Sequence, residues 1–583
     1  MICRFQRYKF YSSGRVSFLF LLSLFLSCNS ANNSKDQTAI YSSEPEILSI
    51  GQQLFEKNCS SCHNFLQRSI GPSLQNATTD LPEEWLRKFI QNAPEMITSG
   101  DLRASMLFKE YKQVMPPFPS LNARQVDAIL AFIHKNQKLV PTPQETSSSF
   151  VKDPIPSSIP LTGGQLHLQY QSTAPATGTK APLARINKMQ SLKGKHERLF
   201  VVDLEGILYE IKDKEWKVAM NIRKLRPHFV SSPGLGTGFG SFAFHPEFHK
   251  NGLLYTTHAE RIDSVPGDIR LVDSTKVRLQ WVLTEWKIRY PLVTPFISKG
   301  RQLLRIDMPT ISHGVQEITF NPLAQKGQED YGLLYIGVGD GGAGEKGFYK
   351  LCNSNKGALS SVLRIDPLGH NSANGRYGIP PGNPNADEKD PLVVKEIFCR
   401  GFRNPNRISW TPDGKMLICD IGQSNIEEIN LGTAGADYGW PEREGTFLVN
   451  PRRDISKVFA LPSNEPPKKY TYPILQYDHD EGRAISGGFV YDGSAIPNLK
   501  GKYVFADITN GRFFLTENHQ LKQGELAPIK ELEIWIDDEL TTFQKINGTA
   551  KPDARLGVGP SGELYVFTKA NGKLYKVVGF NLR

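Results

Sequence analysis

The start of the chain has no acidic residue and no apolar run long enough to cross a membrane. Its first fifteen residues carry four basic side chains, Arg4, Arg7, Lys9 and Arg15, and the apolar run that follows, 16–26, has eleven residues. A helix that spans a bilayer needs about 20 apolar residues. A basic segment followed by a short apolar run is typical of an export signal that is cleaved from the mature protein. The alternative is an uncleaved membrane anchor.

The apolar run ends in a serine that is followed by Cys28. A small residue before a cysteine resembles a lipoprotein cleavage site, at which Cys28 would become the lipidated N-terminus. Cleavage without lipidation near 30–31 is the alternative. We predict a lipoprotein-type signal peptide over 1–27 and a polar tether over 28–44. The protein is therefore expected in the periplasm or on the surface of a bacterial cell, held to a membrane by its lipid.

A strong excess of one charge sign is also missing. Basic residues exceed acidic residues by ten, and by six once 1–27, with four basic residues and no acidic one, is removed. So small an excess in a chain of this length gives no reason to expect a nucleic-acid partner.

Cysteine is scarce as well, and two of the few cysteines lie three positions apart in the motif CSSCH, where they are followed by a histidine. A zinc site would need a second pair of Cys or His residues nearby, but the next cysteine along the chain is Cys352. A redox-active cysteine pair is a further alternative. The CxxCH spacing predicts covalent haem, with Cys59 and Cys62 joined to the haem vinyl groups and His63 bound to the iron.

The segments around this motif alternate between helix-like and loop-like patterns. Apolar residues recur at helical spacing over 47–56, 81–91 and 122–135, whereas the VMPPF stretch at 114–118 reads as a loop. In this order the segments resemble a class I cytochrome c over 45–138. The resemblance implies a small all-α domain that carries haem.

The resemblance also implies the second iron ligand. In this family the methionine of a Met-Pro loop binds the iron opposite the histidine. That role falls to Met115 in this chain, with His63 as the other ligand. Met96 and Met106 are the rival methionines, and packing is the expected role of each.

Three further cysteines, Cys352, Cys399 and Cys419, follow at long distances. Cys399 and Cys419 flank one turn-containing segment, so they either form a disulfide in an oxidising compartment or stay as buried thiols. Cys352 has no assigned role.

The region beyond the haem domain is almost without amphipathic helix patterns. Residues 139–160 are rich in Pro, Ser, Thr and Gln, which is typical of a linker. After them a Pro/Gly turn beside an apolar, aromatic-containing strand recurs at 198–209, 244–255, 320–335, 410–417, 501–505 and 559–565. Such units are typical of hairpins in propeller blades. We predict an all-β, six-bladed propeller over 161–583, with its largest insertion near 261–301.

Four polar loops among these repeats form the candidate site. They contain SHG at 312–314, GDGG at 339–342, GFRNPNR at 401–407 and DIGQ at 420–423. With VLRID, YGIPPGNP and YGWP within 362–441, their order and spacing resemble the PQQ-dependent glucose/sorbosone dehydrogenase family. That family also includes aldose sugar dehydrogenases and the propeller of Hedgehog-interacting proteins, and the likeness covers most of the region beyond the linker.

The resemblance implies a role for each matching residue. His313 is the base that takes the hydroxyl proton of the substrate, and Asp340 orients its imidazole and stabilises the charged form. Arg403 polarises the quinone oxygen on which negative charge develops, and Asn404 lies near the PQQ.

The same resemblance implies a calcium ion beside the quinone. The matching ligands are the backbone carbonyls of Gly422 and Gln423, since calcium prefers hard oxygen donors. Glu427 or Glu428 is expected to support its coordination shell through water.

Four positions depart from the family pattern. Gln316 and Glu317 stand where the family usually has glycine and then Arg or Gln. Thr509 stands where glucose dehydrogenases carry a lysine for a PQQ carboxylate, and Gly236 stands where they often have glutamine. These departures favour a propeller that has lost quinone chemistry.

We predict an exported quinohaemoprotein dehydrogenase that oxidises a sugar or related alcohol with PQQ and passes the electrons through haem to a respiratory acceptor. The covalent link between the domains raises the local concentration of the electron acceptor. The alternative is a surface-anchored propeller that binds carbohydrate or protein, joined to an electron-transfer cytochrome. An eight-bladed quinoprotein alcohol dehydrogenase is disfavoured, because the sequence lacks a vicinal cysteine pair and repeated tryptophan docking motifs.

Overall fold

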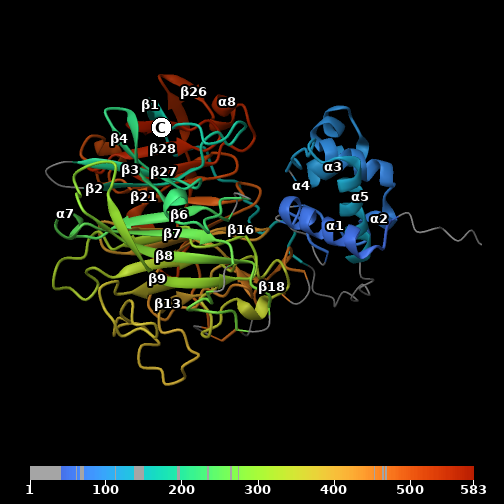
Figure 1. Cartoon of the computed structure of the whole chain (residues 1–583). Helices are drawn as coiled ribbons and strands as arrows, with labels where there is room; N and C mark the ends of the chain where they lie inside the picture. The colour runs from blue at the N-terminus through green and yellow to red at the C-terminus, as the bar shows by residue number, and fades with distance from the viewer. Residues whose placement is uncertain are drawn as a thin grey trace, which may run out of the picture.

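The computed structural model describes residues 41–582 except 61, 66–70, 112, 137–149, 193–196, 233–235, 263–264, 273–274, 452–453, 463–464 and 467–468. A helical part comes first and a large part built of strands follows it (Figure 1). The predicted order of an all-α domain before a large all-β domain is confirmed. The predicted signal peptide and Cys28 lie outside the described residues. None of the described helices has both the length and the apolar character needed to cross a membrane.

Five helices make up the described residues of the first part. They are α1 (Pro45–Asn58), α2 (Ala77–Asp80), α3 (Glu83–Thr98), α4 (Leu102–Tyr111) and α5 (Ala123–Asn136). Helices α1, α3 and α5 match the three predicted helical stretches. Phe55 of α1 and Ile129 of α5 are buried in their shared core.

Two details of this part were not predicted. Helix α3 extends beyond its predicted end at residue 91. Asn92 has non-helical backbone angles and marks a kink, and a further helical turn that contains Pro94 follows it. Helix α4 was missed because its apolar residues do not form a buried stripe: Leu102 is 82% and Met106 69% exposed. The periodicity that identifies a helix in a sequence depends on one buried face.

The second part consists of strands joined by turns and a few short helices. The strands are β1 (Gln165–Thr173), β2 (Ile186–Leu192), β3 (Arg198–Asp203), β4 (Ile207–Lys212), β5 (Glu215–Asn221), β6 (Phe239–Phe244), β7 (Leu253–Glu260), β8 (Leu279–Ile288), β9 (Ser298–Met308), β10 (Glu317–Phe320), β11 (Leu334–Val338), β12 (Ser361–Ile365), β13 (Ile397–Arg400), β14 (Pro405–Trp410), β15 (Met416–Asp420), β16 (Ile426–Leu431), β17 (Arg443–Glu444), β18 (Phe447–Val449), β19 (Val458–Phe459), β20 (Leu475–Asp478), β21 (Ile485–Val490), β22 (Lys502–Asp507), β23 (Phe513–Glu517), β24 (Lys530–Glu531), β25 (Glu533–Ile536), β26 (Glu539–Thr541), β27 (Ala554–Val558), β28 (Leu564–Thr568) and β29 (Lys573–Asn581). The short helices are α6 (Ile222–Leu225), α7 (Phe248–Asn251) and α8 (Phe543–Asn547), with 3₁₀ turns at Tyr349–Leu351, Pro497–Leu499 and Asn518–Gln520.

Within the described residues these strands form seven sheets. Five sheets have four strands each: β2–β5, β6–β9, β10–β13, β14–β16 with β20, and β21–β24. The sixth has the order β26-β25-β1-β29-β28-β27, and β17–β19 form a small separate sheet. Because β1 pairs with β29, the two ends of the β part are held in one sheet.

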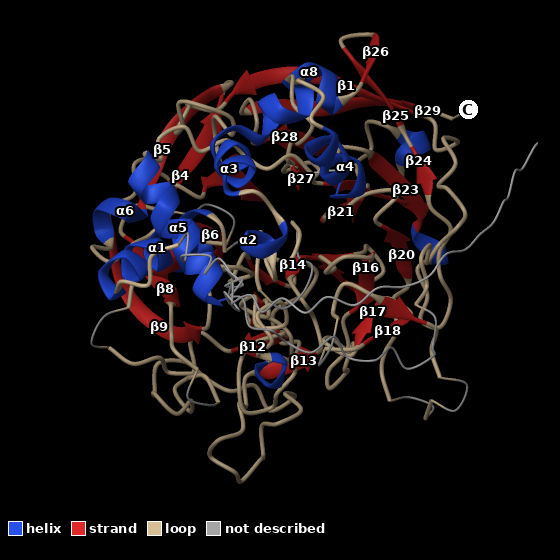
Figure 2. Ribbon diagram, turned by 90° about the vertical axis from the view of Figure 1, so that its right-hand side faces the viewer, coloured by secondary structure: helices blue, strands red, loops and turns tan. Residues whose placement is uncertain are grey.

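Six of these sheets are arranged around a common centre (Figure 2). Their innermost strands β2, β6, β10, β14, β21 and β27 contact one another in this order, and β27 contacts β2 again. The loops at the ends of these strands therefore meet near the centre, although they are far apart in the sequence.

The predicted turn-and-strand repeats have a common place in this arrangement. Five of the six fall between the first and second strands of a sheet, namely β6–β7, β10–β11, β14–β15, β21–β22 and β27–β28, and the first falls between β3 and β4. The repeat that was read from the sequence is thus a repeat of the sheets themselves.

The predicted insertion at 261–301 is wrong in large part. This segment contains β8 and the start of β9, which are two of the four strands of one sheet. Trp281 and Trp286 on β8 are buried in the core, so the tryptophans mark a strand rather than a loop. The insertion with its own secondary structure comes later, where β17–β19 lie between β16 and β20.

The second half of the predicted linker, 139–160, is attached to the β part. Val151 forms a bridge with Val458, and the N–H of Ile155 donates to Asp478 Oδ2 at 3.0 Å. Residues 150–160 therefore pack with the sheets, and 137–149 lie outside the described residues.

Cys399 and Cys419 do not form a disulfide in the structure. Both are buried free thiols, as is Cys352. Burial raises the pKa of Cys419 to about 12 and also raises the pKa of Cys399. The structure therefore agrees with buried thiols, which were one of the two alternatives for Cys399 and Cys419.

A buried group of three charged residues joins three inner strands. Lys188 Nζ of β2 lies 2.5 Å from Glu317 Oε1 of β10, and Arg407 Nη1 of β14 donates to the other carboxylate oxygen. Glu317 is 1% exposed, and burial lowers the pKa of Lys188. The unusual glutamate at 317 therefore balances two buried cations, which explains this departure from the family pattern.

We expect Glu317→Gln to destabilise the protein strongly, because it leaves Lys188 and Arg407 buried without their anion. The free energy of unfolding should fall by about 3–5 kcal/mol, as measured by urea unfolding. The matched control is Asp390→Asn, which removes the exposed pair of Asp390 with Lys356, 2.8 Å apart. That change should cost far less, because solvent screens an exposed ion pair. Equal losses for the two variants would contradict the structural role of Glu317.

Candidate functional site

The first candidate site lies among the helices and contains His63. Its Nδ1 donates to the carbonyl of Pro72 at 2.9 Å, which leaves Nε2 as the nitrogen available to a metal. Gly71 packs flat against the ring, and a Cβ there would lie only 2.4 Å from His63 Cε1. Burial lowers the pKa of His63, so the imidazole is held in the neutral form that binds iron.

His63 and Met115 line the same apolar cavity of about 160 Å³. The other lining residues are mostly apolar and include Cys59, Leu74, Leu81, Trp85, Leu86, Phe89, Ile90, Ile129, Leu130 and Ile133. Met96 and Met106 do not line it. One imidazole nitrogen and one thioether sulfur at an apolar cavity are a donor set that fits haem iron. Among the described residues, no three or more His, Cys, Asp or Glu side chains are grouped to hold a metal ion.

The second candidate site is a cavity of about 670 Å³ in the β part. It brings together the predicted residues His313, Arg403, Asn404, Gly422 and Gln423, which come from three of the four polar loops. The fourth loop, GDGG, contributes Asp340, which forms a hydrogen bond with His313.

The imidazole of His313 is held by the carboxylate of Asp340. His313 Nδ1 lies 2.7 Å from Asp340 Oδ1. Burial raises the pKa of Asp340, but the His313 and Arg403 charges and the Gly342 N–H lower it further, so the net shift is below the usual value. An ionised carboxylate accepts only, so Nδ1 carries the proton and Nε2 has the lone pair. His313 has φ of 44°, a strained conformation for a residue with a Cβ, and such strain is common at functional sites.

Arg403 and Asn404 are positioned by a second buried carboxylate. Asp420 accepts the backbone N–H of Arg403 at 2.8 Å and that of Asn404 at 2.5 Å. The Arg403 guanidinium donates to Gln423 Oε1 at 2.8 Å and to the carbonyl of Ile421 at 3.1 Å. The predicted cation is thus tied to the predicted calcium-binding loop.

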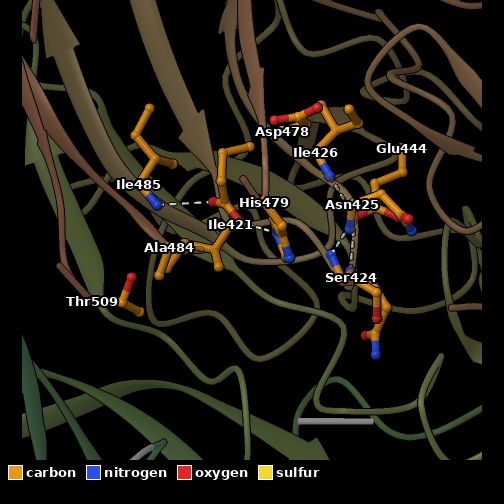
Figure 3. Close-up of polar contacts among 12 residues, drawn as sticks. Ile421, Ser424, Asn425, Ile426, Glu444, Asp478, His479, Ala484, Ile485 and Thr509 are labelled. Atoms are coloured by element: carbon orange, nitrogen blue, oxygen red, sulfur yellow. Dashed lines mark hydrogen bonds and ion pairs between the residues drawn. The ribbon is translucent and has the colours of Figure 1, made fainter. Parts of the chain in front are cut away.

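The loop that carries Gly422 and Gln423 is organised by Glu444, a residue that sequence reasoning missed. Its Oε1 accepts four successive backbone N–H groups, 423–426, at 2.7 to 3.0 Å. Figure 3 shows Glu444 beside Asn425 and Ile426. Glu444 binds the N–H of Gln423 on one side of this loop, and Gly422 and Gln423 line the cavity.

Glu427 and Glu428 are buried and do not line the cavity. Glu427 binds His479 Nε2 at 3.0 Å and the N–H of Ile485 at 2.8 Å. Glu428 Oε1 accepts from Asn430, but Oε2 is buried without a partner. Burial raises the pKa of Glu428 to about 7. A buried, unpartnered carboxylate oxygen near this loop is compatible with a cation, which would depend chiefly on backbone oxygens.

The departures from the family pattern have local causes. A Cβ at Gly236 would lie 2.4 Å from the carbonyl oxygen of Ile311 and 2.7 Å from Ser312 Cα, so no larger residue fits beside the His313 loop. Gln316 lines the cavity. Thr509 also lines it, but its N–H and hydroxyl both bind Asp507, which keeps it in a turn.

A basic wall on the cavity was missed by sequence reasoning. It consists of Arg185, Lys551, Arg555 and Lys569, with Asp553 between the last two. Lys569 is 7% exposed, and burial, with Arg555 next in effect, lowers its pKa to about 7. Three of these cations flank the last hairpin repeat, so their distance from other motifs concealed their place in the site.

Two family models match the chain. The model for glucose/sorbosone dehydrogenase matches residues 188–576, and the model for cytochrome c matches residues 48–137. The first contains most of the residues that line the large cavity, and the second contains His63 and Met115.

Curated proteins and solved structures are similar to parts of the chain. The HIPL1 protein of Arabidopsis thaliana is 27% identical over 311 residues, which are 46% of this chain and 42% of that protein. Quinoprotein glucose dehydrogenase B of Acinetobacter calcoaceticus is 26% identical over 233 residues, 38% of this chain and 43% of that protein. The chain thus spans less than half the length of either relative. The PQQ-bound aldose sugar dehydrogenase of Streptomyces coelicolor aligns with 72% of this chain and 99% of its own, at 17% identity and a TM-score of 0.46.

We expect Met115→Ala to convert a low-spin haem spectrum to a high-spin one, because the iron would lose its sulfur ligand. The measurement is the absorption spectrum of the purified, haem-loaded protein in both oxidation states. Met106→Ala is the matched control, since Met106 is 69% exposed and does not line the haem cavity. A spectrum that changes with Met106 and not with Met115 would overturn the assignment.

Proposed function

The chain belongs to the glucose/sorbosone dehydrogenase family, and on this premise we propose that it is a quinohaemoprotein dehydrogenase for a sugar or related alcohol. The observation that carries the proposal is that His313, Arg403 and Gln423, separated by up to 110 residues, line one cavity. A surface that only bound a ligand would not require a histidine held in one tautomer by a buried carboxylate beside a fixed cation.

His313 acts as the base. Its Nε2 takes the proton of the substrate hydroxyl, and Asp340 holds the ring in the required tautomer and stabilises the imidazolium that forms. The full set of hydrogen bonds to Asp340, from His313, Gly342, Gly344 and Trp440, keeps this carboxylate in place during proton transfer.

The cavity walls fit PQQ, which carries three carboxylates and, when bound, supplies a quinone that accepts two electrons from the alcohol as it becomes a carbonyl. Arg403 would stabilise negative charge on a quinone oxygen. The basic wall of Arg185, Lys551, Arg555 and Lys569 would bind carboxylates, in place of the lysine that Thr509 replaces. Backbone oxygens of Gly422 and Gln423 would hold calcium.

The cytochrome c domain supplies the exit for electrons. His63 and Met115 would hold the iron of a haem joined covalently to Cys59 and Cys62, and this group would supply a one-electron acceptor for the two electrons of each substrate molecule. The two protons pass to solvent, and a one-electron acceptor of the respiratory chain takes the electrons. We also propose that the protein is exported and anchored to a membrane through a lipid on Cys28.

The architecture that we propose for the catalytic domain is a six-bladed propeller. The cyclic contacts among β2, β6, β10, β14, β21 and β27 support it, because each of these strands is the innermost strand of one sheet. Domain limits of 45–138 for the cytochrome c domain and 161–583 for the propeller are part of the proposal.

The proposed activity predicts haem reduction that depends on PQQ, calcium and a sugar or alcohol substrate. His313→Ala should lower the rate of haem reduction by about 10²- to 10⁴-fold, because the general base is lost. The measurement is the haem absorption of the purified protein during a screen of aldoses and alcohols. His370→Ala is the matched control, since His370 is exposed and does not line the cavity.

No substrate-dependent reduction, together with no binding of PQQ, would overturn the enzyme proposal. That result would favour the alternative of a propeller that binds carbohydrate or protein without quinone chemistry.

We expect the affinity for PQQ to fall several-fold between pH 6 and pH 8. Lys569 has its pKa lowered to about 7, so it is charged below this pH and neutral above it, despite the anion of Asp553 nearby. PQQ binding would be measured by fluorescence titration without substrate. Lys569→Arg should remove the dependence, and an unchanged dependence in that variant would contradict the role of Lys569.

A further inference from the structure

The helical domain contributes to the wall of the catalytic cavity. Tyr111, the last residue of α4, and Gln113 line the cavity together with His313 and Arg403. Gln113 precedes the haem-ligand candidate Met115 by two residues. The cavity therefore lies where the two domains meet, and α1 and α4 are on the side of the helical domain that faces the sheets (Figure 1).

One loop of the large domain contacts the haem-binding motif directly. Lys346 Nζ donates to the carbonyl of Ser60 at 2.8 Å and to that of His63 at 3.3 Å. Its side chain is 23% exposed. Lys346 follows Asp340 by six residues in the same loop, and Glu345 between them lines the cavity. The loop that holds the catalytic histidine thus also binds the CSSCH motif.

Two more cations of the large domain bind the helical domain at other points. Arg278 forms a bidentate pair with Glu56 of α1, at 2.8 and 3.1 Å. Arg483 Nη1 donates to the carbonyl of Tyr111. Arg278 precedes β8, Lys346 follows β11 and Arg483 lies between β20 and β21, so the three contacts come from three different sheets.

Three contacts at separate points fix the orientation of the helical domain on the large domain. A flexible tether would only raise the local concentration of one domain near the other. All three use a cation of the large domain, and their acceptors in the helical domain are carbonyl or carboxylate oxygens. Hydrogen bonds from charged donors are stronger than neutral ones. The exposed pair of Arg278 with Glu56 contributes least, because solvent and salt weaken it, while Lys346 is better shielded.

We propose that Lys346, Arg483 and Arg278 form a docking interface that holds the cytochrome c domain on the catalytic cavity in one orientation. The proposal rests on the proposed function and deepens it, because it assigns the residues that place the haem motif beside the loop of Asp340. These three are positioning residues: they do not touch the reacting atoms, and they determine where the electron acceptor sits.

A cross-link tests the docked geometry without any catalytic turnover. In the haem-loaded full chain, Arg278→Lys introduces an amine opposite Glu56, and a carbodiimide should join the two in an amide. Mass spectrometry of the digested protein identifies the joined peptides. Glu56→Gln in the same background is the matched control and should abolish the product. Failure to form this cross-link in folded, haem-loaded protein would overturn the docking interface, whatever the activity.

Rapid-mixing kinetics test whether the docking interface speeds the reduction of the haem. With PQQ, calcium and the best substrate of the screen, Lys346→Met should slow haem reduction about tenfold, since a charged hydrogen bond is lost. Reduction of a small soluble dye by the same variant should be unchanged. Lys356→Met is the control, because Lys356 pairs with Asp390 inside the large domain. Haem reduction as fast in Lys346→Met as in the control would contradict the proposal.

An exchange of charges between Arg278 and Glu56 tests the interface without altering the loop of Lys346. Arg278→Glu should slow haem reduction in low salt, and Arg278→Glu combined with Glu56→Arg should restore it. No restoration in the double variant would count against docking. If neither dye nor haem is reduced by the unmodified protein with any substrate, the proposed function fails, and the cross-link alone decides on the interface.

Discussion

The buried carboxylate of Asp340 is the interaction on which the large cavity depends. One of its oxygens binds His313 and the N–H of Gly342, and the other binds Trp440 and the N–H of Gly344. Its own N–H donates to the carbonyl of Arg403 at 2.8 Å. The base, the cation and the loop that reaches the haem motif are thus connected through one residue. Because a buried charge is costly unless all its hydrogen bonds are made, this arrangement leaves little freedom to any of them.

Charges of opposite sign are separated around the cavity. Cations form its wall on the side of Lys551, Arg555 and Lys569, while Asp420 and the glutamates of β16 are buried beneath the loop of Gly422. Burial raises the pKa of Asp420 well above its usual value, and Glu428 beside it adds to the rise. One side is suited to an anionic group, and a cation on the other side would stabilise the ionised form of the buried carboxylates.

The fusion of the two domains has a structural counterpart in the cavity itself. A tether alone would let the haem approach the catalytic domain from many directions. Cations on loops from three sheets instead meet carbonyl and carboxylate groups of the helical domain, and Tyr111 completes part of the wall. The haem motif and the large cavity are therefore described better as two sides of one interface than as two independent modules.

The sequence by itself determined the local features: the CSSCH motif, three of the helices, the recurring hairpins, and the identity of His313, Asp340 and Arg403. The motif, the helices and the hairpins follow from spacing and periodicity, which are properties of neighbouring residues, whereas the roles of His313, Asp340 and Arg403 came from the resemblance of four polar loops to a known family. Helix α4 was not predicted because it has no stripe of buried apolar residues, and β8 was not predicted because its tryptophans suggested an inserted loop. Only the tertiary structure decided that Glu317 balances two buried cations, that Glu444 organises the loop of Gly422, and that Lys346 reaches the haem motif. Each of these contacts joins residues 18 to about 290 positions apart, and such pairings arise from the way the sheets pack around their centre and carry no short-range signal.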